Sequence, residues 1–431
     1  MAILLGIDIG TTKTACIVYD SYKDLLLFCA SEPNQAFTAP GIQDPEKLLA
    51  QIKTMLRSIP AALKNEISAV GVTGQMHGIV LWNREVTSSL YTWQSTVSET
   101  DLNVVKAVDP TLCQGYGITT LYALQQKEAL KNYLFSGTIM DYLVWHLTGQ
   151  LDKVMIDHTN AASWGAYDLK KHCFKQDVLE QLSIPCELLP EIVPSGTRAG
   201  ETAWEDDTGL PSGIPVMAAI GDNQASVFFT SHDPENELFL TIGTGSQISA
   251  ITESVIPGTG CEYRPYPDGR YLAVAASLCG GASWALLASF FRQTLETFGT
   301  ALSDEMLYRK MDEMALSELH SADIPLVKPS FLGERYDASL RGSIKDLNLH
   351  NFTPSKLAAG FAMGIIRNLY DLLPAEVRGT RNQLLCSGNG IRRNQSLQKA
   401  CAILFGLPCQ FPDTREEAAC GAALLAERLL D

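Results

Sequence analysis

Three short glycine-rich turns, each at the end of an apolar segment, are the first places in this sequence where chemistry can be expected. They lie at residues 10–13, 243–246 and 387–390. Glycine lets the backbone approach a ligand, and turn N–H groups together with Thr or Ser hydroxyls can bind phosphate oxygens. One such turn is typical of a plain hairpin. Two related turns, one in each half of the chain, favour clamps on either side of a polyphosphate.

Two carboxylates stand beside these turns. Asp8 lies inside an apolar segment just before the first turn, an unfavourable place for an acid unless it holds Mg²⁺ through water. Asp222 ends another apolar segment directly before Asn223, where it is placed to take a proton from a substrate hydroxyl. Phosphate donors, a metal and a base are the parts that phosphoryl transfer requires. Either Asp taken singly is equally well explained as a helix or turn cap.

Other catalytic signatures are mostly absent from the sequence. No Gly-Lys dipeptide occurs, which excludes a Walker A loop, and the seven histidines form no H-E-x-x-H pair. The segment Gly281–Ala285 resembles a nucleophile elbow but lacks the final glycine, which disfavours a hydrolase. Eleven scattered cysteines without C-x-x-C spacing are typical of reduced, mostly buried thiols rather than of a disulfide framework or a zinc site.

Composition and charge narrow the class of protein. The 431 residues carry 48 acidic and 33 basic side chains, a formal net charge of −15, which argues against a nucleic-acid or anionic-membrane partner. The first residues lack a basic region and include Asp8, unlike a signal peptide. No apolar run is long enough to cross a bilayer. We therefore expect a soluble, cytoplasmic protein.

The elements that must position these residues alternate between strands and helices. Strands are expected at 2–9, 14–19, 25–30, 67–73, 79–82, 216–220, 238–242, 248–252 and 383–386, and helices at 45–63, 280–298, 355–373, 395–405 and 415–430. The small-residue run 418–423 is expected to allow close helix packing.

The chain contains signs of an internal duplication. Ile9-Gly10-Thr11 and Ile242-Gly243-Thr244 each lie at a turn between apolar strands, offset by 233 residues. The matching strand–turn–strand contexts support a repeat more strongly than the tripeptides do. We therefore expect an α/β protein of two domains, 1–225 with the first phosphate turn and 226–431 with the second.

Six motifs then occur in order along the chain: GIDIGTTKTA, GVTGQMHG, AIGDNQAS, LTIGTGSQ, FLGER and SGNGIRRN. Each alone is weak, but together they resemble the FGGY carbohydrate kinases from residue 3 to about 428. That resemblance implies a two-domain actin-like ATPase (ribonuclease H-like) fold with an interdomain active-site cleft. Within the family, the segments 136–142, 160–165, 188–192 and 275–281 resemble those of sedoheptulokinases, with xylulokinases as close competitors.

The resemblance also implies roles for individual residues. Asp222 would be the general base, and Asp8 would position the Mg²⁺ of MgATP through water. ATP would contact Thr11, Thr12, Lys13, Gly243, Thr244, Gly388, Asn389, Gly390 and Asn394. The open-chain ketose would contact Gln75, Met76, His77, Trp93 and Asn223. His77 and Trp93 could instead be core residues, since both types are often largely buried.

The sequence departs from the family pattern at one point. After Trp93-Gln94 the family usually continues with Asp and then a basic residue, whereas this chain has Ser95-Thr96-Val97. A carboxylate and a cation on the sugar side are therefore missing or supplied from elsewhere. The departure concerns the identity of the substrate rather than the ATP-binding residues.

The function implied is ATP-dependent phosphorylation of the terminal hydroxyl of a ketose, with sedoheptulose as the first choice. A xylulokinase or another pentulose kinase is the alternative within the class. A non-catalytic sugar sensor and an actin-like chaperone ATPase are the alternatives outside it. The expected partners are ATP, Mg²⁺ and a small sugar, without nucleic acid or membrane, and a homodimer is left open.

Overall fold

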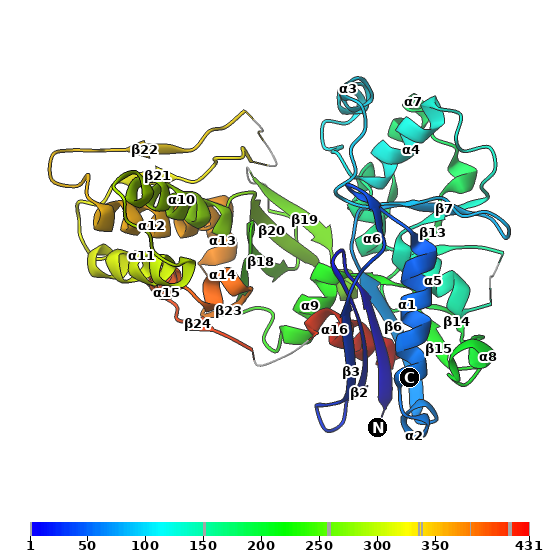
Figure 1. Ribbon diagram of the computed structural model, residues 1–431. Coiled ribbons are helices and arrows are strands. Elements are labelled where there is room, and N and C mark those ends of the chain that lie inside the picture. Colours follow the sequence, from blue (N-terminus) through cyan, green and yellow to red (C-terminus); the bar gives the residue numbers. More distant parts are fainter. Residues whose placement is uncertain are drawn as a thin grey trace. The chain divides into compact units, whose positions relative to one another are not determined.

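The computed structural model describes residues 2–149, 152–256, 260–334, 337, 339–379, 381–412 and 416–430 (Figure 1). The chain forms two compact units. The first comprises Met1–Ser231, Arg264–Gly269 and Thr414–Asp431, and the second comprises His232–Tyr263 and Arg270–Asp413. This division differs from the expected one at residue 225, because that residue lies inside helix α9 (Asp222–Thr230). The C-terminal helix also belongs to the first unit rather than the second.

The main sheet of the first unit is built around β1 (Ile3–Ile9), which pairs antiparallel with β2 (Lys13–Asp20) and parallel with β6 (Ile67–Gly74). Beyond these, β3 (Leu25–Pro33) extends one edge, and β15 (Pro215–Met217) and β14 (Arg198–Glu201) extend the other. The short β16 (Ile220–Gly221) also pairs with β6. Both faces of β1 are largely buried because both faces of the sheet are covered, as expected for a strand with a parallel neighbour.

Helices cover the two faces of this sheet. On one face, α1 (Pro45–Ser58) and α5 (Ile139–Leu147) contribute to the core that includes Leu5, Ile7 and Ile9. On the other face, α9 and α16 (Glu417–Ala426) pack against Leu4 and Ile17. In Figure 1, the red helix α16 lies beside the blue strands of the N-terminal segment, although the two are at opposite ends of the sequence.

The sheet of the second unit repeats this arrangement. Its central strand β17 (Glu237–Ile242) pairs antiparallel with β18 (Ser246–Thr252) and parallel with β23 (Gln383–Ser387). β20 (Tyr271–Ser277) and β19 (Cys261–Pro265) continue one side, and β24 (Cys409–Gln410) is the opposite edge. In both units a three-stranded antiparallel meander is followed by parallel strands on the other side of the first strand. The expected internal duplication is confirmed, and the turns at residues 10–13 and 243–245 occupy equivalent places.

A second equivalence between the units involves two glycines that the sequence analysis did not compare. Gly74 ends β6 beside Ile9, and Gly388 follows β23 beside Ile242. A Cβ on Gly74 would lie 2.5 Å from the Ile9 carbonyl oxygen, and a Cβ on Gly388 would lie 2.5 Å from that of Ile242. Only glycine allows the backbone to pass this close to the first strand.

The helices of the second unit are α10 (Gly281–Thr297), α11 (Asp304–Glu318), α12 (Pro354–Leu372) and α15 (Gln395–Phe405). Their apolar side chains form one core with the inward residues of β17, β18, β20 and β23. The helices expected at 280–298, 355–373 and 395–405 are confirmed to within one residue at each end. Residue 415, where the last expected helix was to begin, lies outside the described residues.

Two sequence-predicted elements are interrupted. The helix expected at 45–63 ends at Ser58, and a separate turn of helix, α2 (Ala61–Lys64), follows Pro60. Proline disfavours helical backbone at the residue before it, so the first helix stops there. The strand expected at 216–220 is divided into β15 and β16.

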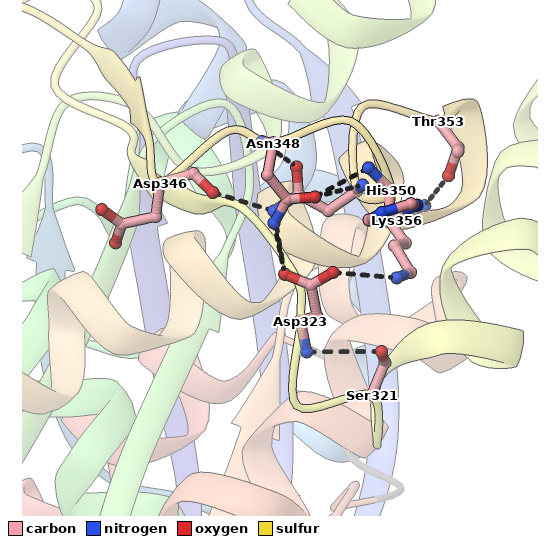
Figure 2. Close-up of polar contacts among 8 residues, drawn as sticks. Ser321, Asp323, Asp346, Asn348, His350, Thr353 and Lys356 are labelled. Atoms are coloured by element: carbon pink, nitrogen blue, oxygen red, sulfur yellow. Dashed lines mark hydrogen bonds and ion pairs between the residues drawn. The ribbon is translucent and has the colours of Figure 1, made fainter.

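A polar network holds the segment between β22 (Ser343–Lys345) and α12 in the second unit (Figure 2). Asp323 Oδ1 accepts hydrogen bonds from Asn348 Nδ2 (2.9 Å) and Asn351 Nδ2 (3.1 Å). Its Oδ2 lies 3.4 Å from Lys356 Nζ on α12. Thr353 caps the start of the same helix. One carboxylate therefore fixes two loop residues and a helix.

The remaining elements are short. They are β4 (Phe37–Ala39), β5 (Ile42–Gln43), β7 (Val80–Trp82), β8 (Leu90–Tyr91), α3 (Glu99–Val108), α4 (Gly117–Gln126), β9 (Phe135–Gly137), β10 (Met155–Asp157), α6 (His158–Ser163), β11 (Tyr167–Asp168), β12 (Cys173–Phe174), α7 (Gln176–Gln181), β13 (Glu191–Val193), α8 (Glu205–Thr208), β21 (Leu326–Lys328), α13 (Ala375–Arg378), α14 (Asn389–Arg392) and the 3₁₀ turns at Cys186–Leu188, Pro267–Gly269 and Glu427–Leu430. Among the described residues, no helix has the length and apolar character needed to cross a membrane.

Candidate active site

Asp8 and Asp222 lie at the carboxyl ends of two strands that flank the same central strand. β1 and β16 both run parallel to β6, and Asp8 and Ile220 both pair with Thr73 of β6. Asp222 follows Ile220 by two residues and is the first residue of α9. Since ligands bind in α/β proteins beyond the carboxyl ends of parallel strands, this edge of the sheet is where a site is expected. The two sequence-predicted carboxylates are brought to that edge together.

Both carboxyl groups are held in an environment that opposes their charge. Burial raises the pKa of Asp8 to about 7, with further contributions from the charges of Asp222 and Glu416. Burial also raises the pKa of Asp222 to about 6, against the effect of the Asn223 backbone N–H, which donates to Asp222 Oδ1 at 2.7 Å. Asp8 Oδ1 is buried and has no hydrogen-bond partner among the described residues. A cation at this place would satisfy that oxygen and relieve the repulsion.

Arg264 is a functional candidate that the sequence analysis missed. It belongs to the short segment Arg264–Gly269 that joins the first unit, and its charge lowers the pKa of Asp222. Gln224 Nε2 on α9 donates to the carbonyl of the next residue, Pro265, at 3.2 Å, and so ties this segment to the helix. Arg264 comes 42 residues after Asp222 in a strand with no motif character, so no local signal could have identified it.

Hydrogen bonds connect the first glycine-rich turn to two of the residues expected to contact the sugar. Thr11 Oγ1 accepts from Trp93 Nε1 (2.8 Å) and donates to Gln75 Oε1 (3.3 Å). Gln75 Nε2 in turn donates to Gln43 Oε1 (2.8 Å), and Gln43 Nε2 donates to the Thr11 carbonyl (2.8 Å). Asn34 Nδ2 supports the turn through the Gly10 carbonyl at 2.7 Å. The structure thus brings Thr11, Gln75 and Trp93 together, and adds Gln43 and Asn34 to the same network.

The other two residues of this turn are on the surface. Thr12 is exposed, and Lys13 forms an ion pair with Glu416 at 2.8 Å. Glu416 directly precedes α16, so it reaches the turn from the far end of the sequence. The Lys13 ammonium, expected to meet a phosphoryl group, therefore has a carboxylate partner within its own unit.

His77 is held in a fixed orientation. Its backbone has a φ of 71°, its N–H donates to Ser163 Oγ (3.0 Å), and its Nδ1 donates to the Ser163 carbonyl (2.6 Å). The ring stacks on Tyr116 with centroids 4.7 Å apart. Neighbouring Met76 is buried, and a Cβ on Gly221 would lie 2.6 Å from its Cε, which places its side chain next to the residue that precedes Asp222.

Trp93 is not a core residue, because 45% of its surface is exposed. Its backbone is packed closely against Gly115, where a Cβ would lie 2.0 Å from the Trp93 carbonyl oxygen. Ser95, which stands where the family usually has Asp, is buried, and its Oγ has no hydrogen-bond partner among the described residues. Arg264, from another part of the chain, supplies a positive charge near Asp222.

In the second unit, the turn after β17 is braced by the segment that begins α10. The N–H groups of Gly281 and Ala282 donate to the carbonyls of Gly243 (2.9 Å) and Thr244 (2.9 Å). A Cβ on Gly281 would lie 2.4 Å from the Gly243 carbonyl oxygen, so glycine is required for this contact. The segment Ala275–Gly281, which carries part of the family resemblance, thus fixes the second glycine-rich turn.

The four residues expected near adenosine have different surroundings. Gly388 has a φ of 89° and leads into α14, which contains Asn389 and Gly390. Asn394 is buried and caps α15, since its Oδ1 accepts from Leu397 N (2.9 Å) and Ser396 Oγ (2.7 Å). Its side chain therefore has a structural role that the sequence analysis did not assign to it.

Glu334 of the FLGER motif is also structural. Its Oε1 accepts hydrogen bonds from Ser277, Ser330 and Asn368, which ties β20 to α12. The last residue of the motif, Arg335, lies outside the described residues. The motif therefore maintains the second unit instead of adding a described side chain to the turns.

Two family models together cover nearly the whole chain. The FGGY family of carbohydrate kinases, N-terminal domain, matches residues 3–229, and the C-terminal domain of the same family matches residues 238–429. The chain belongs to the FGGY family of carbohydrate kinases. It is thus a carbohydrate kinase, as the six ordered motifs predicted.

Relatives of known name are similar along almost their full length. The sedoheptulokinase of Mus musculus is 28% identical, over 98% of this chain and 97% of that protein. The sedoheptulokinase of Homo sapiens is also 28% identical, over 99% and 97%. A glycerol kinase of Chelativorans sp. is 26% identical, over 98% and 89%. The expected similarity to sedoheptulokinases is confirmed.

Solved structures show the same fold. A xylulose kinase from Rhodospirillum rubrum has a TM-score of 0.84 at 21% identity, covering 99% of this chain and 90% of that one. A Plasmodium falciparum glycerol kinase with ADP has a TM-score of 0.79 at 18% identity, covering 100% and 90%. The expected two-domain, actin-like fold is confirmed.

Proposed function

We propose that this chain transfers the terminal phosphoryl group of ATP to the terminal hydroxyl of a ketose, and that the ketose is sedoheptulose. The observation that carries the proposal is the placement of Asp8 and Asp222 at one edge of the sheet, beside the turn that contains Thr11. The choice of sedoheptulose is supported by the similarity to mouse and human sedoheptulokinases.

Asp222 is the general base in this proposal. As the sugar oxygen attacks the terminal phosphorus, its proton moves to the Asp222 carboxylate and ADP leaves. The carboxylate must be ionised at the start, and the Asn223 N–H and the charge of Arg264 both favour that form against burial. A base whose pKa lies near 6 is mostly ionised at neutral pH yet still accepts a proton readily.

Asp8 fits the role of a Mg²⁺ ligand. Its Oδ1 is buried without a hydrogen-bond partner among the described residues, and burial raises its pKa to about 7. Carboxylate oxygens and water are the ligands that Mg²⁺ prefers. When bound, the ion would neutralise charge on the phosphate oxygens.

The remaining residues are assigned to the sugar or to ATP, first for the first unit and then for the second. In the first unit, His77, held by Ser163, and the exposed face of Trp93 would bind the ketose together with Gln75, Met76 and Asn223. Thr11, Thr12 and Lys13 would meet the transferred phosphoryl group. In the second unit, we assign Gly243 and Thr244 to the ATP phosphates and the loop Gly388–Gly390 to adenosine.

The test is an ADP-release assay with ATP and Mg²⁺ against sedoheptulose, D-xylulose, L-ribulose, D-fructose, glycerol and no sugar. We expect sedoheptulose to give the highest kcat/KM, with mass spectrometry showing a phosphate on its terminal carbon. A higher kcat/KM for D-xylulose or L-ribulose would replace the substrate with a pentulose and keep the reaction. Sugar binding without ADP release from any of them would contradict the catalytic proposal and indicate a sensor.

A further inference from the structure

Three cysteines from separate elements meet in the second unit. Cys386 lies on β23, Cys401 on α15 and Cys409 on β24. In the parallel pairing of the two strands, Cys409 stands beside Leu384, so Cys386, two residues further along, points to the same face of the sheet. Cys409 Sγ donates to the carbonyl of Gln398 on α15 at 4.0 Å, one turn before Cys401, and both Cys386 and Cys401 are near enough to shift the pKa of Cys409. We call these three residues the thiol cluster.

The members of the thiol cluster differ in accessibility. Cys386 and Cys401 are buried in the helix–sheet core. Cys409 is only partly buried, and its strand β24 is the edge of the six-stranded sheet. Cys409 is therefore the member of the cluster that a small oxidant can reach most readily. The other two cysteines are buried deeper in the core.

The members also differ in acidity. Hydrogen bonds from Cys386 and then Cys401 lower the pKa of Cys409, because they stabilise its thiolate. The same hydrogen bonds, together with burial, raise the pKa of both Cys386 and Cys401. The thiolate is the form that reacts with peroxides. The accessible member is thus the reactive one, and each buried member is a neighbouring thiol that can resolve its oxidised form.

We propose that the thiol cluster is a site of reversible oxidation, in which hydrogen peroxide converts Cys409 and one buried neighbour into a disulfide. Cys409 sulfur attacks one peroxide oxygen, which gives a sulfenic acid and water. The thiol of Cys401 or Cys386 then attacks that sulfur, and the S–OH oxygen leaves with the thiol proton as a second water. Two thiols lose two electrons and two protons, and the peroxide takes them up.

The disulfide would act on the loop at residues 388–394. β23 leads directly into Gly388, and Asn394 caps the start of α15, so both buried cysteines lie on elements that adjoin this loop. Drawing two of these sulfurs to a bonded distance of about 2.05 Å requires the elements that carry them to shift. The consequence for nucleotide binding rests on the proposed function, which assigns Gly388–Gly390 to adenosine. We expect oxidation to weaken ATP binding several-fold.

The chemical step is tested without any assay of kinase activity. Reduced full-length protein is treated with equimolar to tenfold hydrogen peroxide, remaining thiols are alkylated, and peptides are mapped by mass spectrometry without reduction. We expect a cross-link between the peptide of Cys409 and that of Cys401 or Cys386, reversed by dithiothreitol and absent in Cys409→Ser. Cys401→Ser and Cys386→Ser identify the resolving thiol, and Cys173→Ser, at an exposed cysteine outside the cluster, is the matched control.

Circular dichroism and thermal unfolding establish that each variant is folded, and Cys409→Ala is a second variant if serine disturbs the sheet edge. Oxidation of Cys409 to sulfinic acid without a cross-link, or no faster oxidation of Cys409 than of Cys173, would overturn the proposal.

Equilibrium dialysis with ATP then compares reduced and oxidised protein. A mapped disulfide with unchanged ATP affinity overturns only the effect on the loop, whereas a mapped disulfide in a protein that never binds ATP counts against the proposed function.

Discussion

Asp222 illustrates how one residue is made suitable for proton transfer by contacts that lie far apart in sequence. Its backbone position comes from β16 and α9, its ionised form is supported by the Asn223 N–H, and Arg264 contributes a positive charge. Burial alone would favour the protonated acid. The balance between these effects decides whether Asp222 is a base at neutral pH.

Replacing Asp222 with Asn removes the proton acceptor and keeps the size of the side chain. We expect kcat for sugar phosphorylation to fall by about 10²–10⁴-fold, the usual contribution of a general base. ATP affinity, measured by equilibrium dialysis, is expected to stay near that of the wild type. Asp168→Asn, at a turn outside the site, is the control. Retained turnover in Asp222→Asn would refute the assignment of the base.

Trp93 gives a second test at the residue scale. Trp93→Phe keeps an aromatic face and removes the Nε1 donor to Thr11. Because that hydrogen bond orients Thr11 toward Gln75, we expect a several-fold rise in KM for the sugar with a smaller change in kcat. Trp93→Ala removes the face as well and is expected to raise KM further. Equal KM values for the wild type and both variants would show that the indole does not contact the sugar.

At the scale of elements, the strands and helices predicted from the sequence were correct where a hydrophobic pattern within the segment itself determines them. The strands on either side of the turns at 10–13 and 243–246 follow from apolar runs, and three of the second unit's helices follow from their periodicity. Pro60 shows a local signal that was overlooked, since it ends α1.

The candidate site was predictable only in part, for a physical reason. Asp8, Thr11 and Asp222 lie in motifs, so sequence identifies them. Gln43 and Arg264 reach the site through strand pairing and chain reversal, and neither has a distinctive neighbour in sequence. Asn394 has a helix-capping role that its place in a family motif did not indicate.

Asp141, in the first turn of α5, predicts a pH dependence of stability. Its Oδ2 accepts from the N–H (2.8 Å) and Oγ1 (2.7 Å) of Thr138, and its Oδ1 has no hydrogen-bond partner among the described residues. Burial raises its pKa to about 8, so the folded protein keeps a proton that the unfolded chain releases near the ordinary aspartate pKa of 3.8. The unfolded state is therefore increasingly favoured as pH rises from about 4 to about 8.

Asp141→Asn keeps an oxygen that can accept from Thr138 and does not titrate. Both proteins are unfolded with urea between pH 5 and pH 7.5. We expect the free energy of unfolding of the variant, minus that of the wild type, to increase as pH rises. The gain is at most about 1.4 kcal/mol per pH unit, the free energy of one pKa unit. A difference between the two proteins that does not change with pH would contradict a protonated Asp141.

At the scale of the whole molecule, α16 joins the C-terminal end of the chain to the first unit by packing against α9, β1 and β6. A Cβ on Gly421 would lie 1.9 Å from the carbonyl oxygen of Ala225 on α9, and a Cβ on Gly71 of β6 would lie 2.0 Å from the carbonyl oxygen of Ala422. The small residues of α16 thus allow backbone-to-backbone packing, as predicted for the run 418–423.

Gly421→Ala tests this packing. A methyl group so close to a backbone oxygen forces α9 and α16 apart. We therefore expect the free energy of unfolding to fall by about 1–3 kcal/mol, the usual cost of overpacking. Gly379→Ala, where a Cβ would lie 3.2 Å from the nearest atom, is the matched control and should change stability far less. Both are measured by urea unfolding at one pH. Equal stabilities would show that α9 and α16 can separate without cost.

The return of α16 to the first unit also has a consequence for synthesis on the ribosome. β1, β6 and α9 emerge early, but the helix that covers their shared apolar face is made only after nearly all of the second unit. The first unit therefore cannot finish folding before the second has been translated, and its face around Leu4, Ile17 and Ala69 stays open to chaperones during that interval. A nascent chain arrested before residue 416 would expose that surface and become a substrate for proteolysis, however complete its second unit.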